Sequence, residues 1–376
     1  MNRHAETASL LGDPKRGRHA KESRAWQGSL SDRVRVTRKL PQAILKISSH
    51  NSGQGRVRAR LRYISRQGAL AIETDEGISV EGIEGVDRLV DDWAADFSTR
   101  VNSRDTMSLV ISMPAGTDEK VAVAAARAFF AETFAENHEY AFAAHDDTDN
   151  FHIHLVVKAR GRDGKPMRAS RRDPQLWRQA FAEKARENGI ELDASPRYAR
   201  GIGRRTPPTS VFEIRRRDEM PTVDKQAAKE ALRRARNAKD RPSKSETVIR
   251  QINVRERLMY AKQASVVVKE AKSIKDDKRR LAALEIASEL ASFAEGMPVP
   301  QSRMDTMKFA LKPKLGRASV EMGEVRKLVK RTERGIRDQV GGFASTKDQR
   351  TAIAARVRLS NVVSERNRSR DRDIER

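Results

Sequence analysis

The sequence contains no cysteine. This absence excludes a disulfide framework, a thiolate metal site and a cysteine nucleophile. No apolar run approaches the roughly 18 to 20 residues that span a bilayer, so membrane insertion is not expected. The first residues also lack the apolar stretch of a secretory signal. Together these absences predict a soluble, intracellular protein.

Aromatic and apolar side chains are scarce as well. Aromatic residues make up 5% of the chain and hydrophobic residues 38%, whereas charged residues make up 34%. With so few apolar residues, not all of the chain can pack into a core. The low aromatic content also argues against extensive base stacking along a nucleic-acid groove.

Positive charge is abundant and unevenly distributed. The chain carries 76 Lys and Arg against 52 Asp and Glu, a net charge of +24. Residues 1–40 contribute +6, residues 41–203 contribute −1, and residues 204–376 contribute +19. Such a surplus suits a partner that bears phosphates. The neutral middle is therefore predicted to be the folded catalytic or binding domain, with basic segments on both sides.

The pattern of apolar residues predicts an α+β domain, because strands and helices mix without regular βαβ alternation. Strands are expected near residues 42–50, 108–112, 140–144 and 152–157, and helices near residues 56–67, 86–97, 119–136 and 174–188. The predicted organisation is a disordered segment 1–40, a folded domain 41–205, a basic linker or helix 206–250, and a mostly helical basic region 251–376.

Three of the seven histidines lie within ten residues, at His145, His152 and His154. Alternate residues of a strand share a face, so His152 and His154 should point the same way. The turn-forming residues 146–150 should fold the preceding strand back and bring His145 beside them. Three neutral imidazoles suit a divalent cation. The alternatives are a hairpin without a ligand and a structural zinc site.

Tyr63 lies on a predicted helix that is dense in arginine. A tyrosine hydroxyl has a pKa near ~10 and attacks poorly without help from a cation or a base. A bound metal would relieve the repulsion of a phosphodiester, and Arg62 and Arg66 could hold adjacent phosphates. The alternative is a partly buried helix tyrosine among solvated arginines.

Taken together, these motifs resemble those of conjugative relaxases. Leu61-Arg-Tyr-Ile-Ser-Arg-Gln-Gly68 is followed about eighty residues later by the three-histidine motif. The chain is most similar to the T-DNA border endonuclease branch of the mobilisation nucleases, within the His-hydrophobic-His endonuclease superfamily. The resemblance covers about residues 43–203. Supporting segments are Ser112-Met-Pro-Ala-Gly-Thr-Asp118, Ser170-Arg-Arg-Asp-Pro-Gln-Leu176 and Leu192-Asp-Ala-Ser.

The resemblance implies roles for individual residues. Tyr63 matches the nucleophile, and the three histidines match ligands of Mg²⁺ or Mn²⁺. Asp147 and Asp149 match the acids of the motif, one of which would support a ligand or help to deprotonate the tyrosine. Asn150-Phe151 stands where the family has His-Pro, and Lys158 where this branch has Asn. The residues expected to contact nucleic acid are Arg62, Ser65, Arg66, Lys158, Arg171 and Arg172.

The implied function is strand-specific nicking and religation at a plasmid transfer origin. Tyr63 would become joined to the 5′ phosphate of single-stranded DNA. A type IV secretion coupling protein and accessory relaxosome proteins would be partners, and the bacterial cytoplasm the location before transfer to a recipient cell. Residues 355–376 are too polar to bury and are expected to stay accessible. The resemblance implies that they carry the secretion signal; the alternative is a solvated helix end or a loose non-specific contact with DNA.

Other functions remain open at this point. A rolling-circle replication initiator shares the histidine motif, but its tyrosine commonly follows the histidines, where Tyr198 is the available residue. A metal-dependent phosphodiesterase that uses water would need no tyrosine. A non-enzymatic basic DNA-binding accessory protein would explain the charge but not three clustered imidazoles.

Overall fold

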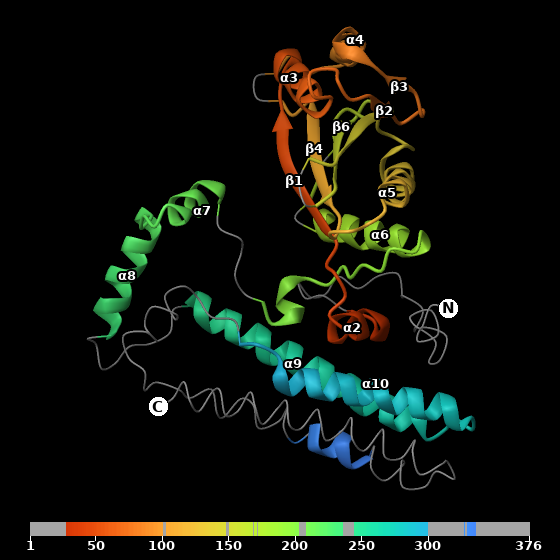
Figure 1. Ribbon diagram of the computed structural model, residues 1–376, viewed down its shortest axis with the longest axis vertical. Helices are drawn as coiled ribbons and strands as arrows, with labels where there is room; N and C mark the ends of the chain where they lie inside the picture. The colour runs from red at the N-terminus through yellow and green to blue at the C-terminus, as the bar shows by residue number, and fades with distance from the viewer. Residues whose placement is uncertain are drawn as a thin grey trace. The chain divides into compact units, whose positions relative to one another are not determined.

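A computed structural model describes residues 28–100, 103–147, 150–167, 169–170, 172–202, 208–235, 244–299, 327 and 329–335 (Figure 1). Asp149, Arg171 and the predicted signal at 355–376 lie outside the described residues. The chain divides into two compact units. One comprises residues 39–194 and is called the sheet unit below. The other, called the helical unit, consists of the segments before and after it.

The sheet unit is built on a six-stranded antiparallel sheet with the strand order β1-β4-β6-β5-β2-β3. The strands are β1 (Ile44–Asn51), β2 (Ile72–Thr74), β3 (Ser79–Val80), β4 (Thr106–Ser112), β5 (Tyr140–His145) and β6 (His152–Lys158). The predicted α+β class and the predicted pairing of β5 with β6 are confirmed. The short strands β2 and β3 were not predicted, because two or three residues carry too little alternation to detect.

Four helices flank this sheet: α3 (Gln54–Ile64), α4 (Gly82–Ala94), α5 (Glu119–Phe134) and α6 (Asp173–Glu187). Helix α5 begins as its sequence predicts, because the Asp118 side chain accepts a hydrogen bond from the backbone N–H of Val121 at 3.0 Å. Helix α3 ends at Ile64, earlier than its predicted stop at Gly68, since Arg66 and Gln67 adopt positive φ angles.

The two faces of the sheet carry different cores. Helices α5 and α6 cover one face, where Leu109, Ile153 and Leu155 are fully buried. Helices α3 and α4 cover part of the other, on Ala141, Ala143 and Val156. Figure 1 shows α3 and α4 together at one end of the sheet, away from α5 and α6. Because side chains alternate along a strand, the histidines of β6 share a face with Val156 and therefore with α3.

The helical unit contains α2 (Leu30–Thr37), the 3₁₀ helix η1 (Arg197–Arg200), α7 (Thr209–Arg216), α8 (Thr222–Ala235), α9 (Lys244–Ala271) and α10 (Asp277–Gly296). Its core includes Tyr260 of α9 and Leu284 and Leu290 of α10. Among the described helices, none is long and apolar enough to cross a membrane.

Two parts of the chain differ from the predicted organisation. Residues 30–37 fall within the segment predicted to be disordered but form helix α2, because a Ser29–Asp32 capping box starts the helix and Val34 is buried in the core of the helical unit. The sheet unit ends at Ala194, before the predicted boundary at 205. Ala199 instead joins the helical unit, where the Tyr260 hydroxyl donates to its carbonyl oxygen at 3.0 Å.

Gly68 fixes the exit of the chain from α3 and yields a testable prediction. Its φ is +85°, and a Cβ there would lie 2.7 Å from the carbonyl carbon of Gly82 and closer still to the backbone nitrogen of Ile83. We expect Gly68→Ala to lower the free energy of unfolding by about 3 kcal/mol, through backbone strain plus steric overlap. Urea denaturation followed by the fluorescence of Trp93 and Trp177, both in the sheet unit, measures this change.

Gly77→Ala is the matched control for this prediction. Gly77 has a similar φ of +77°, but nothing lies within 4 Å of the added methyl group. It should therefore cost only the backbone strain, about 1 kcal/mol. Equal losses for the two variants would contradict a steric role for Gly68.

Candidate functional site

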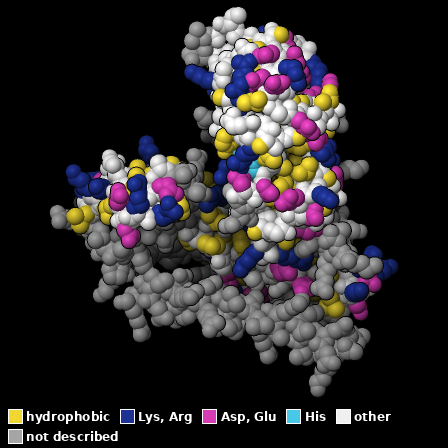
Figure 2. Space-filling model, turned by 45° about the horizontal axis from the view of Figure 1, so that its top comes forward, with side chains coloured by type: hydrophobic (Ala, Val, Ile, Leu, Met, Phe, Trp, Pro, Cys, Tyr) yellow, Lys and Arg dark blue, Asp and Glu magenta, His cyan; other side chains and the backbone are white. Residues whose placement is uncertain are grey.

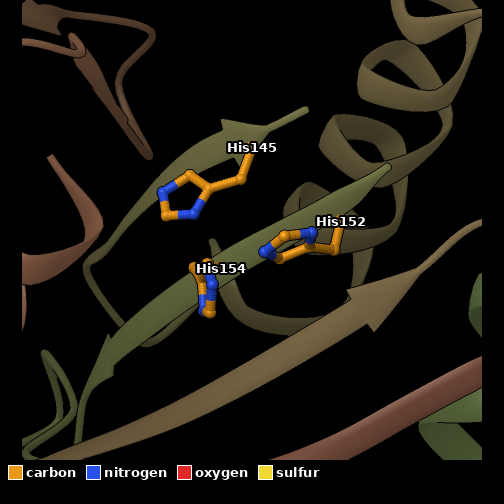
Figure 3. Close-up of side chains that lie close together, drawn as sticks. All are labelled: His145, His152 and His154. Atoms are coloured by element: carbon orange, nitrogen blue, oxygen red, sulfur yellow. The ribbon is translucent and has the colours of Figure 1, made fainter. Parts of the chain in front are cut away.

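The three histidines converge at the end of the β5–β6 hairpin that carries the turn. His145 lies directly opposite His152 in the antiparallel ladder, and Ala143 lies opposite His154. The candidate ligand atoms of the three side chains all lie within 4.8 Å of one another. Figure 3 shows His145 on one strand and His152 and His154 on the next, with their rings gathered on the same side of the sheet. The convergence that the sequence predicts is therefore present.

The hydrogen bonds of the rings fix which nitrogen carries a proton. A carbonyl oxygen only accepts, so Nε2 of His145 donates to the Ile64 carbonyl at 2.8 Å, and Nδ1 of His152 faces the Asn150 carbonyl at 3.2 Å. Nδ1 of His154 lies 3.1 Å from the Arg60 guanidinium, which only donates. Nε2 of His154 is buried and has no hydrogen-bond partner among the described residues.

Burial keeps two of these imidazoles neutral. His145 and His154 are only 1% and 6% exposed. Desolvation, reinforced by the neighbouring His145, lowers the pKa of His154 to about 3. Desolvation, with a contribution from Arg66, also lowers the pKa of His145. Neutral imidazoles are the form that binds metals, and a buried nitrogen without a partner fits a ligand atom. The residues present therefore fit a divalent cation.

Tyr63 stands beside this cluster. Its side chain comes from the last turn of α3 and is 52% exposed, unlike the apolar residues around it on the helix. Its ring centroid lies 5.8 Å from that of His154 and 6.5 Å from that of His145. The rings of Tyr63 and His154 are thus neighbours on the face of the sheet that α3 partly covers, and Tyr63 remains exposed to solvent.

Asp147 and Arg66, two of the residues selected from the sequence, also lie at the cluster. Arg66 forms an ion pair with Asp147, and its guanidinium lies 3.2 Å from Nδ1 of His145. Asp147 in turn lies 3.9 Å from Nε2 of His152. The hydrogen bond and charge of Arg66 lower the pKa of Asp147, so this carboxyl group is ionised at neutral pH. Together they form a charged rim on the histidine cluster.

The other residues expected to contact nucleic acid are not gathered there. Arg62 is paired with Asp87 of α4, with its Nε 2.9 Å from Oδ1. Ser65 is fully buried and donates to the Arg62 carbonyl. Lys158 is 4% exposed and pairs with Asp96 at 2.7 Å and with Glu139 at 2.5 Å. Arg172 precedes α6 as its N-terminal flanking residue.

Arg60 is at the site although the sequence analysis did not select it. Its guanidinium carbon lies 5.2 Å from the centroid of the Tyr63 ring, in addition to its contact with His154. The available signal was helical spacing, because residue 60 is three positions before Tyr63 and therefore shares its helix face. In Figure 2 a small area of histidine reaches the surface of the sheet unit beside Lys and Arg side chains.

The lowered pKa of His154 predicts a pH dependence of stability. Below pH 6.5 the unfolded chain takes up a proton that native His154 does not accept until about pH 3. The metal-free protein should therefore lose stability as pH falls from 6.5 towards 3, by at most about 1.4 kcal/mol per pH unit from this group. Urea denaturation in chelator measures the slope. We expect His154→Gln to reduce the slope, and identical slopes would contradict the assignment.

Comparisons with known proteins agree with this geometry. Residues 63–190 match the family model for the nuclease domain of MobA/VirD2-like relaxases. The T-DNA border endonuclease VirD2 of Rhizobium radiobacter is 32% identical over 182 residues, which cover 43% of this chain and 42% of that protein. The VirD2 endonuclease of Rhizobium rhizogenes is 33% identical over 180 residues, or 42% of this chain and 40% of that protein.

The match is confined to one part of each chain, since the aligned region covers about two fifths of each of these relatives. No solved structure matches the chain. The matched residues include Tyr63, the three histidines and most of the sheet unit. Residues 63–190 are thus similar in sequence to the nuclease domains of MobA/VirD2-like relaxases, and the resemblance that the motifs indicate is confirmed.

Proposed function

We propose that the sheet unit nicks single-stranded DNA with Tyr63 as its nucleophile. The observation that supports this most directly is the position of Tyr63, half-exposed and 5.8 Å from His154 between ring centroids. The tyrosine oxygen would attack a backbone phosphorus, and the bond from phosphorus to the 3′ oxygen would break. The tyrosine hydroxyl gives up its proton, the departing 3′ oxygen takes one up, and the products are a 5′ phosphotyrosine and a free 3′ hydroxyl. Reversal of the same step religates the strand.

His145, His152 and His154 would hold a divalent cation, Mg²⁺ or Mn²⁺. When bound, such a cation supplies Lewis-acid stabilisation of the charge that develops on the phosphate oxygens. The protein's own contribution is to hold the rings. The Ile64 carbonyl fixes the proton of His145 on Nε2, and the Asn150 carbonyl does the same for Nδ1 of His152.

Asp147 has a positioning role in this proposal. Its lowered pKa makes it a weak base, because Arg66 stabilises the carboxylate form. It pairs with Arg66, whose guanidinium lies 3.2 Å from Nδ1 of His145, and this ion pair suits it to position Arg66 at the cluster. Deprotonation of Tyr63 is therefore not assigned to Asp147. Asp149, the second acid of the motif, lies outside the described residues.

The wider activity is part of the same proposal. Similarity to proteins named T-DNA border endonucleases supports strand-specific nicking at a transfer origin, with the covalent strand then carried into a recipient cell. A secretion coupling protein and accessory relaxosome proteins would be the partners. The basic segments outside the sheet unit, which hold all of the net positive charge, would supply affinity for phosphates.

The rolling-circle initiator is less well supported. It would need a tyrosine downstream of the histidines, and the available residue, Tyr198, is partly buried against the core of the helical unit. Tyr63 precedes the histidines, which is the order in relaxases. A non-enzymatic DNA-binding protein would have no use for three clustered imidazoles.

Replacement of Tyr63 tests the nucleophile. We expect Tyr63→Phe to abolish covalent adducts because the change removes only the attacking oxygen, while DNA binding survives. A randomised pool of labelled single-stranded oligonucleotides, incubated with Mg²⁺ or Mn²⁺ and resolved on a denaturing gel, reveals the adduct, and sequencing of the attached strand maps the nick. Tyr198→Phe is the control and should leave adduct formation unchanged. An adduct from Tyr63→Phe would place the nucleophile elsewhere.

Replacement of the histidines tests the metal. We expect His152→Ala and His154→Ala each to weaken Mn²⁺ binding at least tenfold in calorimetry and to remove nicking, because a three-ligand site loses a ligand. His50→Ala is the matched control, since His50 is exposed near the end of β1 and lies outside the cluster. Undiminished nicking by the wild type in excess chelator would refute metal dependence.

A further inference from the structure

Arg60 is a cation at the centre of the site with no anionic partner among the described residues. Its guanidinium lies 3.1 Å from Nδ1 of His154 and 3.3 Å from the Ser48 hydroxyl, and neither group carries negative charge. Its Nε is buried without a hydrogen-bond partner among the described residues. Burial lowers the pKa of this guanidinium, which nevertheless stays protonated. A charge in this setting is stabilised by an anion that arrives from outside.

Three neighbouring arginines differ from Arg60 in this respect, whereas Arg56 is exposed to solvent in the first turn of α3. Arg58 pairs with Asp91, and Arg62 pairs with Asp87, both on α4. Arg66 pairs with Asp147. These guanidinium groups are therefore neutralised within the protein, whereas the charge of Arg60 is available.

Arg60 also holds His154 in a tautomer that cannot bind a metal ion through Nε2. A neutral imidazole has one nitrogen lone pair, and in His154 it accepts from Arg60 at Nδ1. A cation bound by His154 requires that lone pair, or a proton shift that removes it from Nδ1. In either case the hydrogen bond from Arg60 is lost. The guanidinium and the metal thus compete for the same ring.

We propose that Arg60 is a phosphate-binding residue of this site, held on His154 in the metal-free protein and released to the attacked phosphate when a divalent cation binds the ring. This inference rests on the proposed nuclease function. The guanidinium fork matches two phosphate oxygens, and its place over the Tyr63 ring puts it beside the group that would attack them. A bound phosphate would also offset the repulsion between Arg60 and the cation.

The competition is tested by Mn²⁺ binding to the full-length protein without DNA, measured by electron paramagnetic resonance of the free ion. We expect Arg60→Ala to tighten Mn²⁺ binding about tenfold, because the variant removes a competing donor and a like charge. Arg58→Ala, on the same helix but paired with Asp91, should leave it unchanged. A residue needed only for structure would weaken binding when removed, so unchanged or weaker binding overturns the proposal. Arg60→Gln replaces Arg60→Ala if the latter does not fold.

The phosphate contact is tested separately in the Tyr63→Phe background with Mg²⁺. The probe is the single strand mapped from the covalent adduct, with one non-bridging oxygen of the attacked phosphate replaced by a methyl group. With Arg60 present, this neutral linkage should reduce affinity about tenfold, as expected for loss of a charge-assisted contact. In the Arg60→Ala variant the methyl group should reduce affinity much less. In the Arg60→Lys variant the reduction should be intermediate. Equal reductions in all three would overturn the phosphate role.

The two proposals fail in different ways. If the wild type forms no Tyr63-dependent adduct, the proposed nuclease function fails, and the Mn²⁺ measurement still decides whether Arg60 competes for His154. If adducts form but the methyl substitution reduces affinity equally with and without Arg60, the nuclease function stands and the proposed phosphate contact of Arg60 is wrong.

Discussion

The register between β5 and β6 is the constraint on which the candidate site depends. His145 pairs with His152, and this pairing puts both rings and His154 on the face that α3 partly covers. A slip of one residue would send His145 to the opposite face, where α5 and α6 bury an apolar core. That core resists the slip, because Tyr140 and Phe142 of β5 would have to leave it. Packing of the apolar face therefore fixes the register that brings the three histidines together on the opposite face.

Burial sets the electrostatics of the cluster. Desolvation is the largest influence on His145 and His154, and it favours the neutral ring at both. The nearby guanidinium groups act in the same direction, since a positive neighbour opposes protonation of an imidazole. The same desolvation destabilises the charged guanidinium group of Arg60 when no anion is paired with it. The cluster thus combines neutral imidazoles, which suit a cation, with a guanidinium group that suits an anion.

The parts of the site that follow from local sequence could be predicted, and those that depend on packing between helices could not. The hairpin needs only strand alternation and a turn, so the approach of His145 to His152 was predictable from ten residues. The pairing of Arg62 with Asp87 depends on how α3 packs against α4, and the local sequence pattern does not predict that packing. Lys158 lies on the same face as the histidines but six residues from His152, where Asp96 and Glu139 enclose it. Its strand position was predictable, whereas its neighbours were not.

The division of charge along the chain separates two physical tasks. Residues 41–203, which contain the histidine cluster, have a net charge of −1, so they offer little general attraction for a polyanion. Within them, Arg58, Arg62 and Arg66 are neutralised by carboxylates, which leaves local rather than overall positive charge. Residues 204–376 carry +19. For a nuclease this division places long-range, salt-sensitive affinity in the flanking segments and confines phosphate selection to the few uncompensated donors beside Tyr63.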